Sequence, residues 1–403
     1  MHAERAGGRW GASSSERLLV STISSHDCVR ANAVGDDPTS LVDQLCTQLG
    51  PGPHALSVVF AAPSVERGSI ARLLQERFPD SLVVGCSTAG EIGIGGYRSG
   101  GAVALALSSA SFRVEHTVFR DVRSLGVAEG QLQVQALLRR LAAAGVSPTA
   151  NNTFALLLVD GLSFAEEALA GMAATVLGDI PMAGGSAGDG LAFGTTHVFA
   201  GGQALPHGAV LVLVQTELPF EVFKTQHFAA GERRMVVTAA HCPTRTVYEI
   251  DGLPAADEFA RLHGKTFDGL GPDFFAAHPL LVRVGGGEYV RSIQRKNPDG
   301  SLSFFCAIEE GLVLRDACGH ELVQDFTQMV GKLERSLGGV QATIVFDCIL
   351  RRLECERLGT VPQVSAIFER ARSCGFSTYG EQFRGIHVNQ TLTGVAIGGR
   401  DKA

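Results

Sequence analysis

The stretch Val83-Val-Gly-Cys-Ser-Thr-Ala-Gly-Glu91 decides the fold, because a short apolar strand runs directly into a glycine-rich turn that ends on an acid. Glycine adopts backbone angles in such turns that other residues resist. A strand over residues 57–61 and a helix over 70–78 precede this stretch, and a strand over 102–107 follows it. The segment is therefore predicted to form one β-α-turn-β unit.

The same order of parts occurs twice more along the chain. Each copy has a strand, a helix, a turn with serine, glycine and an acid, and a last strand: 155–159, 166–177, 182–189 and 209–214, then 342–346, 364–372, 375–381 and 393–397. The middle of the first strand lies 29, 30 and 33 residues before Ser87, Ser186 and Ser377. This internal repeat predicts an α/β fold of repeated β-α-turn-β units, with mixed sheets flanked by helices.

The parts outside the repeats suggest the domain organisation. Residues 1–17 are rich in Gly, Ser and Arg and predict a flexible tail, with an opening strand at 18–23. Residues 225–338 separate the second and third copies and have their own strand and helix patterns. We therefore predict an N-terminal domain over 18–220 with two units and a C-terminal domain over 221–403 with the third.

Composition argues against several functional classes. The 403 residues carry a net charge of −7 without a basic run, which gives no electrostatic basis for nucleic-acid binding. The sequence has no apolar stretch of membrane-spanning length and no signal-peptide pattern, so a cytoplasmic location is expected. Nine scattered cysteines without a Cys-x-x-Cys pair predict reduced thiols.

The glycine-rich turns have two chemical interpretations. Cys86 lies at a strand-to-turn junction, where hydrolases expose a nucleophile, but Gly185 and Phe376 occupy its place in the other copies. The turn at 183–190 could offer backbone N–H groups to an anion, although it matches neither the dinucleotide nor the P-loop spacing. We expect tight turns that join strands, and a protein that is not an enzyme.

The recurring acids of the three turns are Glu91, Asp189 and Glu381. Recurrence at one place in each copy favours a shared turn or capping role over acid–base chemistry. Glu381 is the exception, because it lies six residues before His387.

His387 is the strongest candidate ligand among the twelve histidines. Strand alternation places it on one face with Asn389 and Thr391, and a neutral imidazole on a rigid strand suits haem iron. From the residues alone, a hydrogen-bonded strand residue is favoured over a haem ligand. His197 follows Ser186 by eleven residues, as His387 follows Ser377 by ten, so the two histidines are expected at matching places.

A second candidate haem contact is the pair His241-Cys242, which precedes Pro243. A thiolate beside proline binds ferric iron well, but such dipeptides are common, and a Cys-Pro turn without a haem role is favoured.

Taken together, these segments resemble the FIST family, a pair of sensory domains of bacterial signalling proteins. The motifs at 84–92 and 184–189 look like its N-terminal domain, and Val247-Tyr-Glu-Ile-Asp-Gly-Leu-Pro254 looks like the entry to its C-terminal domain. The segments 344–352, 375–382 and 385–391 are similar to NosP-type nitric-oxide-sensing haemoproteins.

This resemblance implies haem b with His387 as the axial ligand of the iron, and Asn389, Glu381 and Tyr379 beside the cofactor. It also implies that nitric oxide is sensed and that a separate sensor histidine kinase is regulated in trans, as in two-component control of biofilms.

The alternative is a FIST sensor without haem that binds a small metabolite such as an amino acid. The sequence leaves open whether the protein is a homo-oligomer, and whether His197, His241 or Cys242 contributes a ligand.

Overall fold

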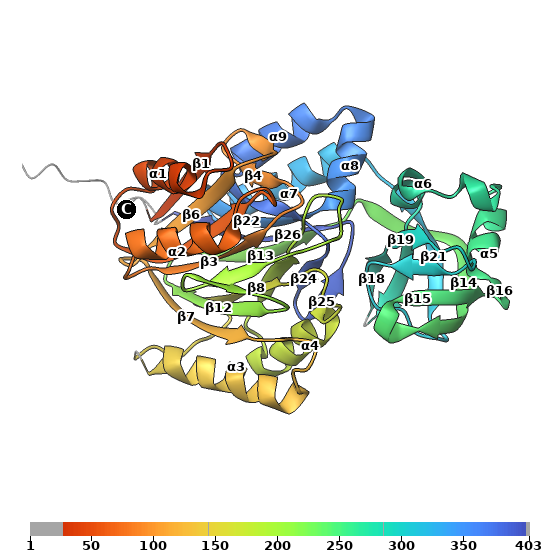
Figure 1. Ribbon diagram of the computed structural model, residues 1–403, viewed down its shortest axis with the longest axis horizontal. Coiled ribbons are helices and arrows are strands. Elements are labelled where there is room, and N and C mark those ends of the chain that lie inside the picture. The colour runs from red at the N-terminus through yellow and green to blue at the C-terminus, as the bar shows by residue number, and fades with distance from the viewer. Residues whose placement is uncertain (1–26, 144, 285, 400–403) are drawn as a thin grey trace, which may run out of the picture.

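The computed structural model describes residues 27–143, 145–284 and 286–399. Three repeated units form a single core, and a smaller unit projects from one side of it (Figure 1). The predicted tail and the strand expected at 18–23 lie outside the described residues.

The first unit contains β1 (Cys28–Ala33), α1 (Pro38–Leu49), β2 (His54–Ala61), α2 (Arg67–Arg77), β3 (Leu82–Ser87), β4 (Glu91–Gly93), β5 (Gly96–Arg98) and β6 (Ala102–Ser108). Helix α1 begins where the Asp37 carboxylate caps the Ser40 N–H and Pro38 sets the first turn. Its leucines and valine at 41, 42, 45 and 49 are buried because they share one face at helical spacing.

The second unit contains β7 (Phe112–Phe119), α3 (Val127–Ala142), β8 (Thr153–Val159), α4 (Glu166–Leu177), β9 (Met182–Ser186), β10 (Val198–Ala200), β11 (Gln203–Leu205) and β12 (Ala209–Thr216). The third contains β13 (Phe220–Thr225), α7 (Leu322–Ser336), β22 (Val340–Cys348), α8 (Ile349–Leu358), α9 (Val361–Arg370), β23 (Ser373–Thr378), β24 (Glu381–Phe383), β25 (Ile386–Val388) and β26 (Leu392–Gly398).

The core has three six-stranded sheets whose strands follow one common order. These orders are β1-β6-β2-β3-β10-β11, β7-β12-β8-β9-β24-β25 and β13-β26-β22-β23-β4-β5. The last two strands of every sheet are a hairpin that belongs to another unit. Each unit thus gives one hairpin and receives one, and the exchange closes into a ring.

A glycine stands at the same place in the inner strand of each sheet. A Cβ on Gly85, Gly184 or Gly375 would lie 1.8, 2.2 or 1.9 Å from a carbonyl oxygen of the parallel neighbouring strand. No side chain fits at such a separation. The glycine that recurs in each copy of the sequence repeat is therefore required by the close contact between two parallel strands.

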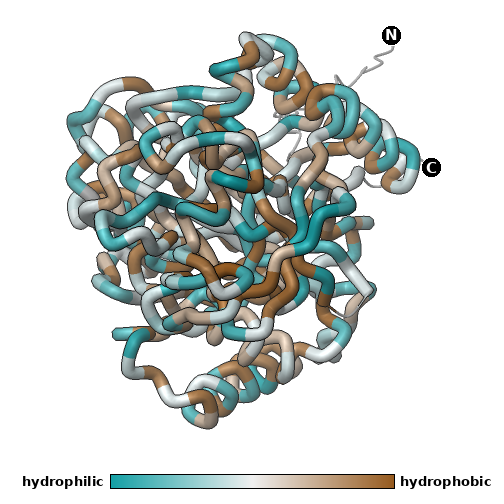
Figure 2. The backbone as a smooth tube through the Cα atoms, turned by 90° about the vertical axis from the view of Figure 1, so that its right-hand side faces the viewer, coloured by the Kyte–Doolittle hydropathy of each residue, from teal (hydrophilic) through white to brown (hydrophobic). Residues whose placement is uncertain are grey.

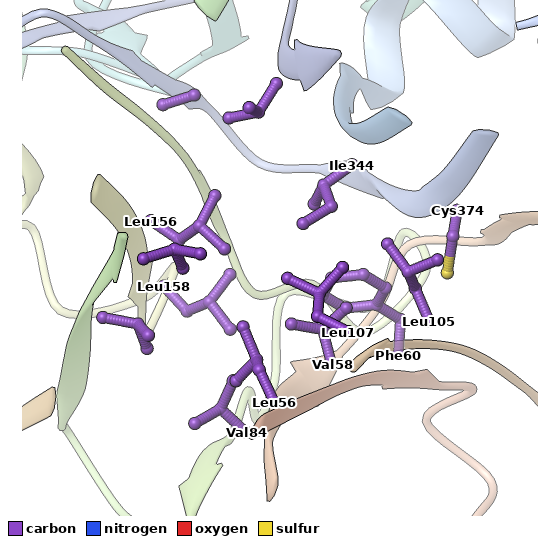
Figure 3. Packing of buried hydrophobic residues seen from close by; sticks show 14 of the residues in the cluster. Leu56, Val58, Phe60, Val84, Leu105, Leu107, Leu156, Leu158, Ile344 and Cys374 are labelled. Carbon is purple, nitrogen blue, oxygen red and sulfur yellow. The ribbon is translucent and has the colours of Figure 1, made fainter. Parts of the chain in front are cut away.

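The inner faces of the three sheets form one hydrophobic core. Leu56, Val58 and Phe60 of β2 meet Leu156 and Leu158 of β8 there (Figure 3). Phe346 of β22 contacts Phe60 edge to face, with ring centroids 6.5 Å apart. Helices cover the outer faces, and α3 at the bottom of Figure 2 alternates hydrophobic and hydrophilic residues as a one-sided helix should.

The insert, residues 228–319, leaves the third unit after β13 and returns to it before α7 (Figure 1). Its strands form one sheet, β18-β17-β21-β14-β15-β20-β19, with β16 beside β15. Its elements are β14 (Phe228–His241), β15 (Thr246–Ile250), β16 (Leu253–Pro254), α5 (Ala255–Leu262), α6 (Pro272–Ala277), β17 (Leu280–Val284), β18 (Gly287–Arg291), β19 (Ile293–Lys296), β20 (Leu302–Phe304) and β21 (Val313–Gly319), with short 3-10 turns at Cys242–Thr244 and Phe267–Gly269.

The predicted α/β architecture of repeated units is confirmed, and the helix expected at 166–177 has those bounds. The predicted boundary at 220/221 falls just inside β13, the first strand of the third sheet. The exchange of hairpins was not predicted. Pairing between distant three-residue strands leaves no local signal in a sequence.

Candidate functional site

The three turns meet where the sheets converge. The amides of Ser87, Ser186 and Ser377 donate to the carbonyls of His197, Gly380 and Gly90, at 2.9, 2.8 and 2.7 Å. These equivalent bonds make His197 the counterpart of Gly90 and Gly380. The prediction that His197 and His387 occupy matching places is therefore wrong, because equal spacing along the chain spans loops of different shape.

His387 is the middle residue of β25 and pairs with Gln382 of β24. The equivalent hairpin positions hold Tyr97 and Ala204. The imidazole therefore belongs to one copy alone, which separates it from the structural features that all three units share.

The recurring acids do hold turns. Glu91 and Glu381 each accept a hydrogen bond from the threonine three residues earlier, Thr88 and Thr378. Asp189 accepts the N–H groups of residues 193, 194 and 195 and the hydroxyl of Tyr379. The Tyr379 ring also stacks on Phe193, with centroids 4.6 Å apart. Glu381 and Tyr379, two of the three predicted haem neighbours, therefore have structural roles.

Glu381 is fully buried, and burial raises its pKa from the ordinary 4.5 to about 8 against the opposing hydrogen bonds from Thr378 and Thr391. The unfolded chain then releases this proton at a lower pH than the folded protein. The free energy of unfolding should fall as pH rises from about 4.5 to about 8.

We expect Glu381→Gln to remove this part of the pH dependence, as measured by urea unfolding between pH 4 and 9. The exposed Glu76→Gln serves as the control and should leave the curve parallel to that of the wild type. A Glu381→Gln curve that also stays parallel would contradict the raised pKa.

The His387 imidazole is buried and adjoins Gly380. A Cβ on Gly380 would lie 2.6 Å from His387 Nε2 and 3.3 Å from the side-chain amide nitrogen of Asn389. The edge of the imidazole ring and this side-chain amide therefore lie close together. The side-chain amide nitrogen of Gln382 lies 3.3 Å from His387 Nδ1.

Burial lowers the pKa of His387, and the nearby Glu167 and Glu166 carboxylates only partly oppose this effect. A neutral ring is therefore expected at neutral pH. Its Nε2 is buried and has no hydrogen-bond partner among the described residues.

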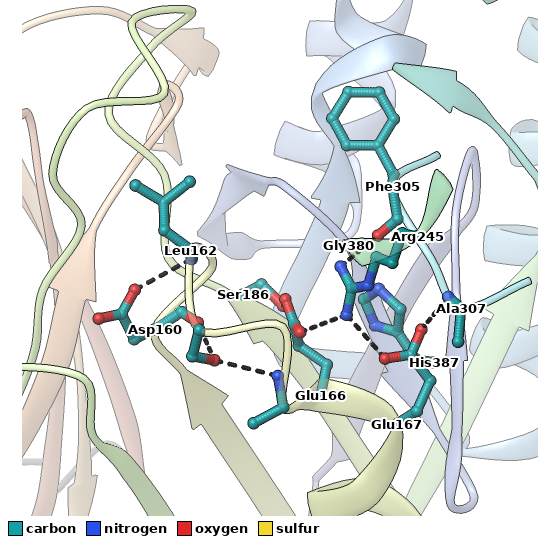
Figure 4. A network of polar contacts seen from close by, with 12 residues as sticks. Asp160, Leu162, Glu166, Glu167, Ser186, Arg245, Phe305, Ala307, Gly380 and His387 are labelled. Atoms are coloured by element: carbon teal, nitrogen blue, oxygen red, sulfur yellow. Dashed lines mark hydrogen bonds and ion pairs between the residues drawn. The ribbon is translucent and has the colours of Figure 1, made fainter. Parts of the chain in front are cut away.

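Arg245 links the insert to the core beside this histidine (Figure 4). Its guanidinium contacts the Glu166 and Glu167 carboxylates at 2.6 and 2.7 Å and donates to the Phe305 carbonyl at 2.6 Å. Both glutamates are in the first turn of α4, where the helix dipole favours negative charge. Glu167 also accepts the Ala307 N–H at 2.6 Å.

Two strained residues meet in this contact. Arg245 and Phe164 have φ angles of 52° and 58°, which are unfavourable for side chains of their size, and the guanidinium lies 5.0 Å from the Phe164 ring centroid. Strain of this kind gathers at functional positions when surrounding contacts hold it.

Buried polar atoms without partners gather at the same boundary between core and insert. We define the junction site by His387, Asn389 and Gln390 of the core, Arg291 and Ser292 of the insert, and the Arg245 ion pairs. The unpartnered atoms are His387 Nε2, both amide atoms of Asn389, Gln390 Oε1, Arg291 Nε and Ser292 Oγ. The Gln390 amide nitrogen contacts the Ala276 carbonyl and the Arg291 guanidinium the His387 carbonyl, at 2.8 and 3.5 Å.

A porphyrin does not fit these surroundings as folded. The neighbours of the ring are amides and charged groups, and a haem plane requires an apolar slot.

The remaining candidates are placed as follows. Cys86 is buried, and burial raises the pKa of its thiol well above the usual value, which opposes a nucleophilic role. The side chain of His241 contacts Thr244 at 2.9 Å, and Cys242 Sγ lies 4.0 Å from Glu309 in the insert.

Within the described residues, no helix has the length and apolar character needed to cross a bilayer.

Arg245, Arg291 and Gln390 were not predicted as site residues. Only the paired acids Glu166-Glu167 at the start of a predicted helix gave a signal in the sequence. The two arginines are far from them in sequence, and no local pattern connects them.

Comparison with known proteins identifies two family domains in the chain. The FIST N domain matches residues 55–253 and the FIST C domain matches residues 255–384. This division lies inside the insert, further along the chain than the predicted boundary. No curated protein matches the sequence. A cyanuric acid hydrolase crystal structure from A. caulinodans is similar at 10% identity and a TM-score of 0.38, over 92% of this chain and 99% of that one.

Proposed function

The chain belongs to the FIST family of sensory signal-transduction domains, and from this premise we propose that its junction site binds a small polar metabolite such as an amino acid. The observation that supports the proposal is the cluster of buried, unpartnered donors and acceptors where the core meets the insert. Buried polar groups are costly unless they are satisfied, so a polar ligand would stabilise this site.

The arrangement suits sensing more than catalysis. The acids of the three turns are engaged in holding backbone, and the imidazole has no acid bonded to its second nitrogen that would make it a strong base. A ligand that contacts both core and insert would bias their relative position. This is how ligand binding becomes a signal for a partner.

The test is the thermal stability of the full chain with each of the twenty common amino acids. A ligand at 100 times its Kd should add about 2.7 kcal/mol to the free energy of unfolding. We expect Asn389→Leu to remove the effect, because leucine keeps the volume but offers neither donor nor acceptor. His116→Ala on β7, outside the junction site, is the control. Equal stabilisation of Asn389→Leu and the wild type would refute the site.

The finer hypothesis of a haem b sensor stays a prediction. Its support is the unpartnered, buried Nε2 of His387, and it would require nitric oxide as ligand and a histidine kinase regulated in trans. Protein purified from haem-replete cells should then show a Soret band that shifts with nitric oxide and is lost in His387→Ala. A colourless wild type that still responds to an amino acid would exclude haem.

A further inference from the structure

The insert joins the core through two short segments that meet at His227. The entering segment runs from β13 to β14 through Gln226 and His227, and the returning segment runs from β21 to α7 through His320 and Glu321. The main-chain N–H of His320 donates to the His227 carbonyl at 2.7 Å. The next residue, Phe228, begins β14, and its ring centroid lies 4.2 Å from that of the imidazole. His227 therefore lies where both connections leave the core.

The imidazole of His227 is buried between two side chains of α8. Its Nδ1 lies 3.1 Å from a guanidinium nitrogen of Arg351, and its Nε2 lies 2.8 Å from a carboxylate oxygen of Glu354. A guanidinium can only donate hydrogen bonds, and an ionised carboxylate can only accept them. The neutral ring therefore has its lone pair on Nδ1 and its proton on Nε2.

Arg351 is held in the core by contacts on its other side. It is fully buried, and its Nε donates to the Asp347 carboxylate of β22 at 2.8 Å. The hydroxyl of Tyr97, on the β5 hairpin of the first unit, donates to the same carboxylate. Residues of the first and third units thus hold the guanidinium in place, and the guanidinium holds the imidazole.

A second proton on the His227 ring has no acceptor in this arrangement. It would place an N–H group on Nδ1 against the guanidinium of Arg351, with two positive charges in contact. Burial lowers the pKa of His227 below its ordinary 6.5, and the Arg351 charge acts in the same direction. The carboxylates of Glu354 and of Asp325 on α7 oppose these two effects only in part. The imidazole therefore takes up a proton more readily after it has left α8.

We propose that His227 is a proton-sensitive latch, which holds the insert against the core when the imidazole is neutral and releases the two connecting segments when it is protonated. In water the released ring regains an ordinary pKa and binds protons more tightly than the docked ring. Docking should be complete above about pH 6.5 and weaken as the pH falls below this value. The inference goes beyond the proposed function, because it requires no metabolite and makes the position of the insert respond to pH.

The test is hydrogen exchange of the full chain between about pH 7.5 and pH 5.5, without added ligand. Rates are converted to protection factors, which removes the chemical effect of pH on exchange. The protection factor of the His320 amide should fall by about five- to tenfold on acidification, because the opened state takes up one proton. The amides of β12 in the second sheet should keep their protection.

Two variants make the test specific. In His227→Gln the new side-chain amide can accept from Arg351 and donate to Glu354 but does not titrate, so the pH response of the His320 amide should disappear. His116 on β7 is a half-buried histidine whose pKa is also lowered by burial, and His116→Gln should keep the response.

The ring nitrogens of His227 give a second measurement that needs no variant. Their nitrogen-15 chemical shifts in the folded wild type should show an unprotonated Nδ1 and a protonated Nε2 at pH 7.5. A proton on Nδ1 at that pH would overturn the latch. A His320 protection factor that ignores pH in the wild type, or still follows it in His227→Gln, would do the same and leave the metabolite site unaffected.

Discussion

Arg245→Ala is expected to lower the free energy of unfolding by about 3–5 kcal/mol, because it leaves two glutamates at the start of α4 without their cation. Glu166 is fully buried, so solvent cannot replace the lost guanidinium. The carbonyl of Phe305 loses its donor in the same change. Urea unfolding at neutral pH measures the loss, and proteolysis of the segments that join the insert to the core should become faster.

Arg283→Ala is the matched control for this effect. Arg283 also lies in the insert and pairs with a glutamate, Glu288, and the two side chains are 63% and 28% exposed. Exposed pairs contribute between zero and about 1 kcal/mol. Similar losses in the two variants would show that the buried contact is no more important than a surface pair.

Gly85→Ala is expected to be at least as damaging, through a different mechanism. The added Cβ would lie 1.8 Å from the Val59 carbonyl oxygen and 2.4 Å from the Phe199 ring. The first obstacle is backbone of a parallel strand and cannot rotate away. We expect the free energy of unfolding to fall by about 3 kcal/mol or more, measured by thermal and urea unfolding.

Gly171→Ala in α4 is the control that makes this test specific. The nearest atom to its added Cβ is 4.0 Å away. Alanine in a helix is favoured over glycine by about 0.5–1 kcal/mol, so this variant should be slightly more stable than the wild type. Similar losses in both variants would mean that glycine is not needed for close packing at residue 85.

The sequence was a good guide to the repeated units because each depends on local chemistry. Strand, helix and glycine turn follow one another within about thirty residues, and Gly85, Gly184 and Gly375 mark the same packing constraint in each. Helix α8 was missed. Its pattern is weakly amphipathic, with Cys355 the one buried residue of its last turn.

The site was only partly predictable. His387 and Asn389 stood out by strand alternation, but their chemical surroundings come from Arg291 and Arg245, about 100 and 140 residues away in sequence. The position of the Gln382 side-chain amide beside the ring depends on contacts with Ser186 and Gly380. Such contacts exist only after the sheets have assembled.

Because the second sheet contains a hairpin of the third unit, this sheet cannot be completed until the third unit has been synthesised. The second sheet needs β24 and β25, which come after all its other strands in the chain. Until they leave the ribosome, β9 has an open edge that another polypeptide could pair with. Nascent chains that stall between β12 and β24 should therefore be more prone to aggregate than chains that include β24 and β25.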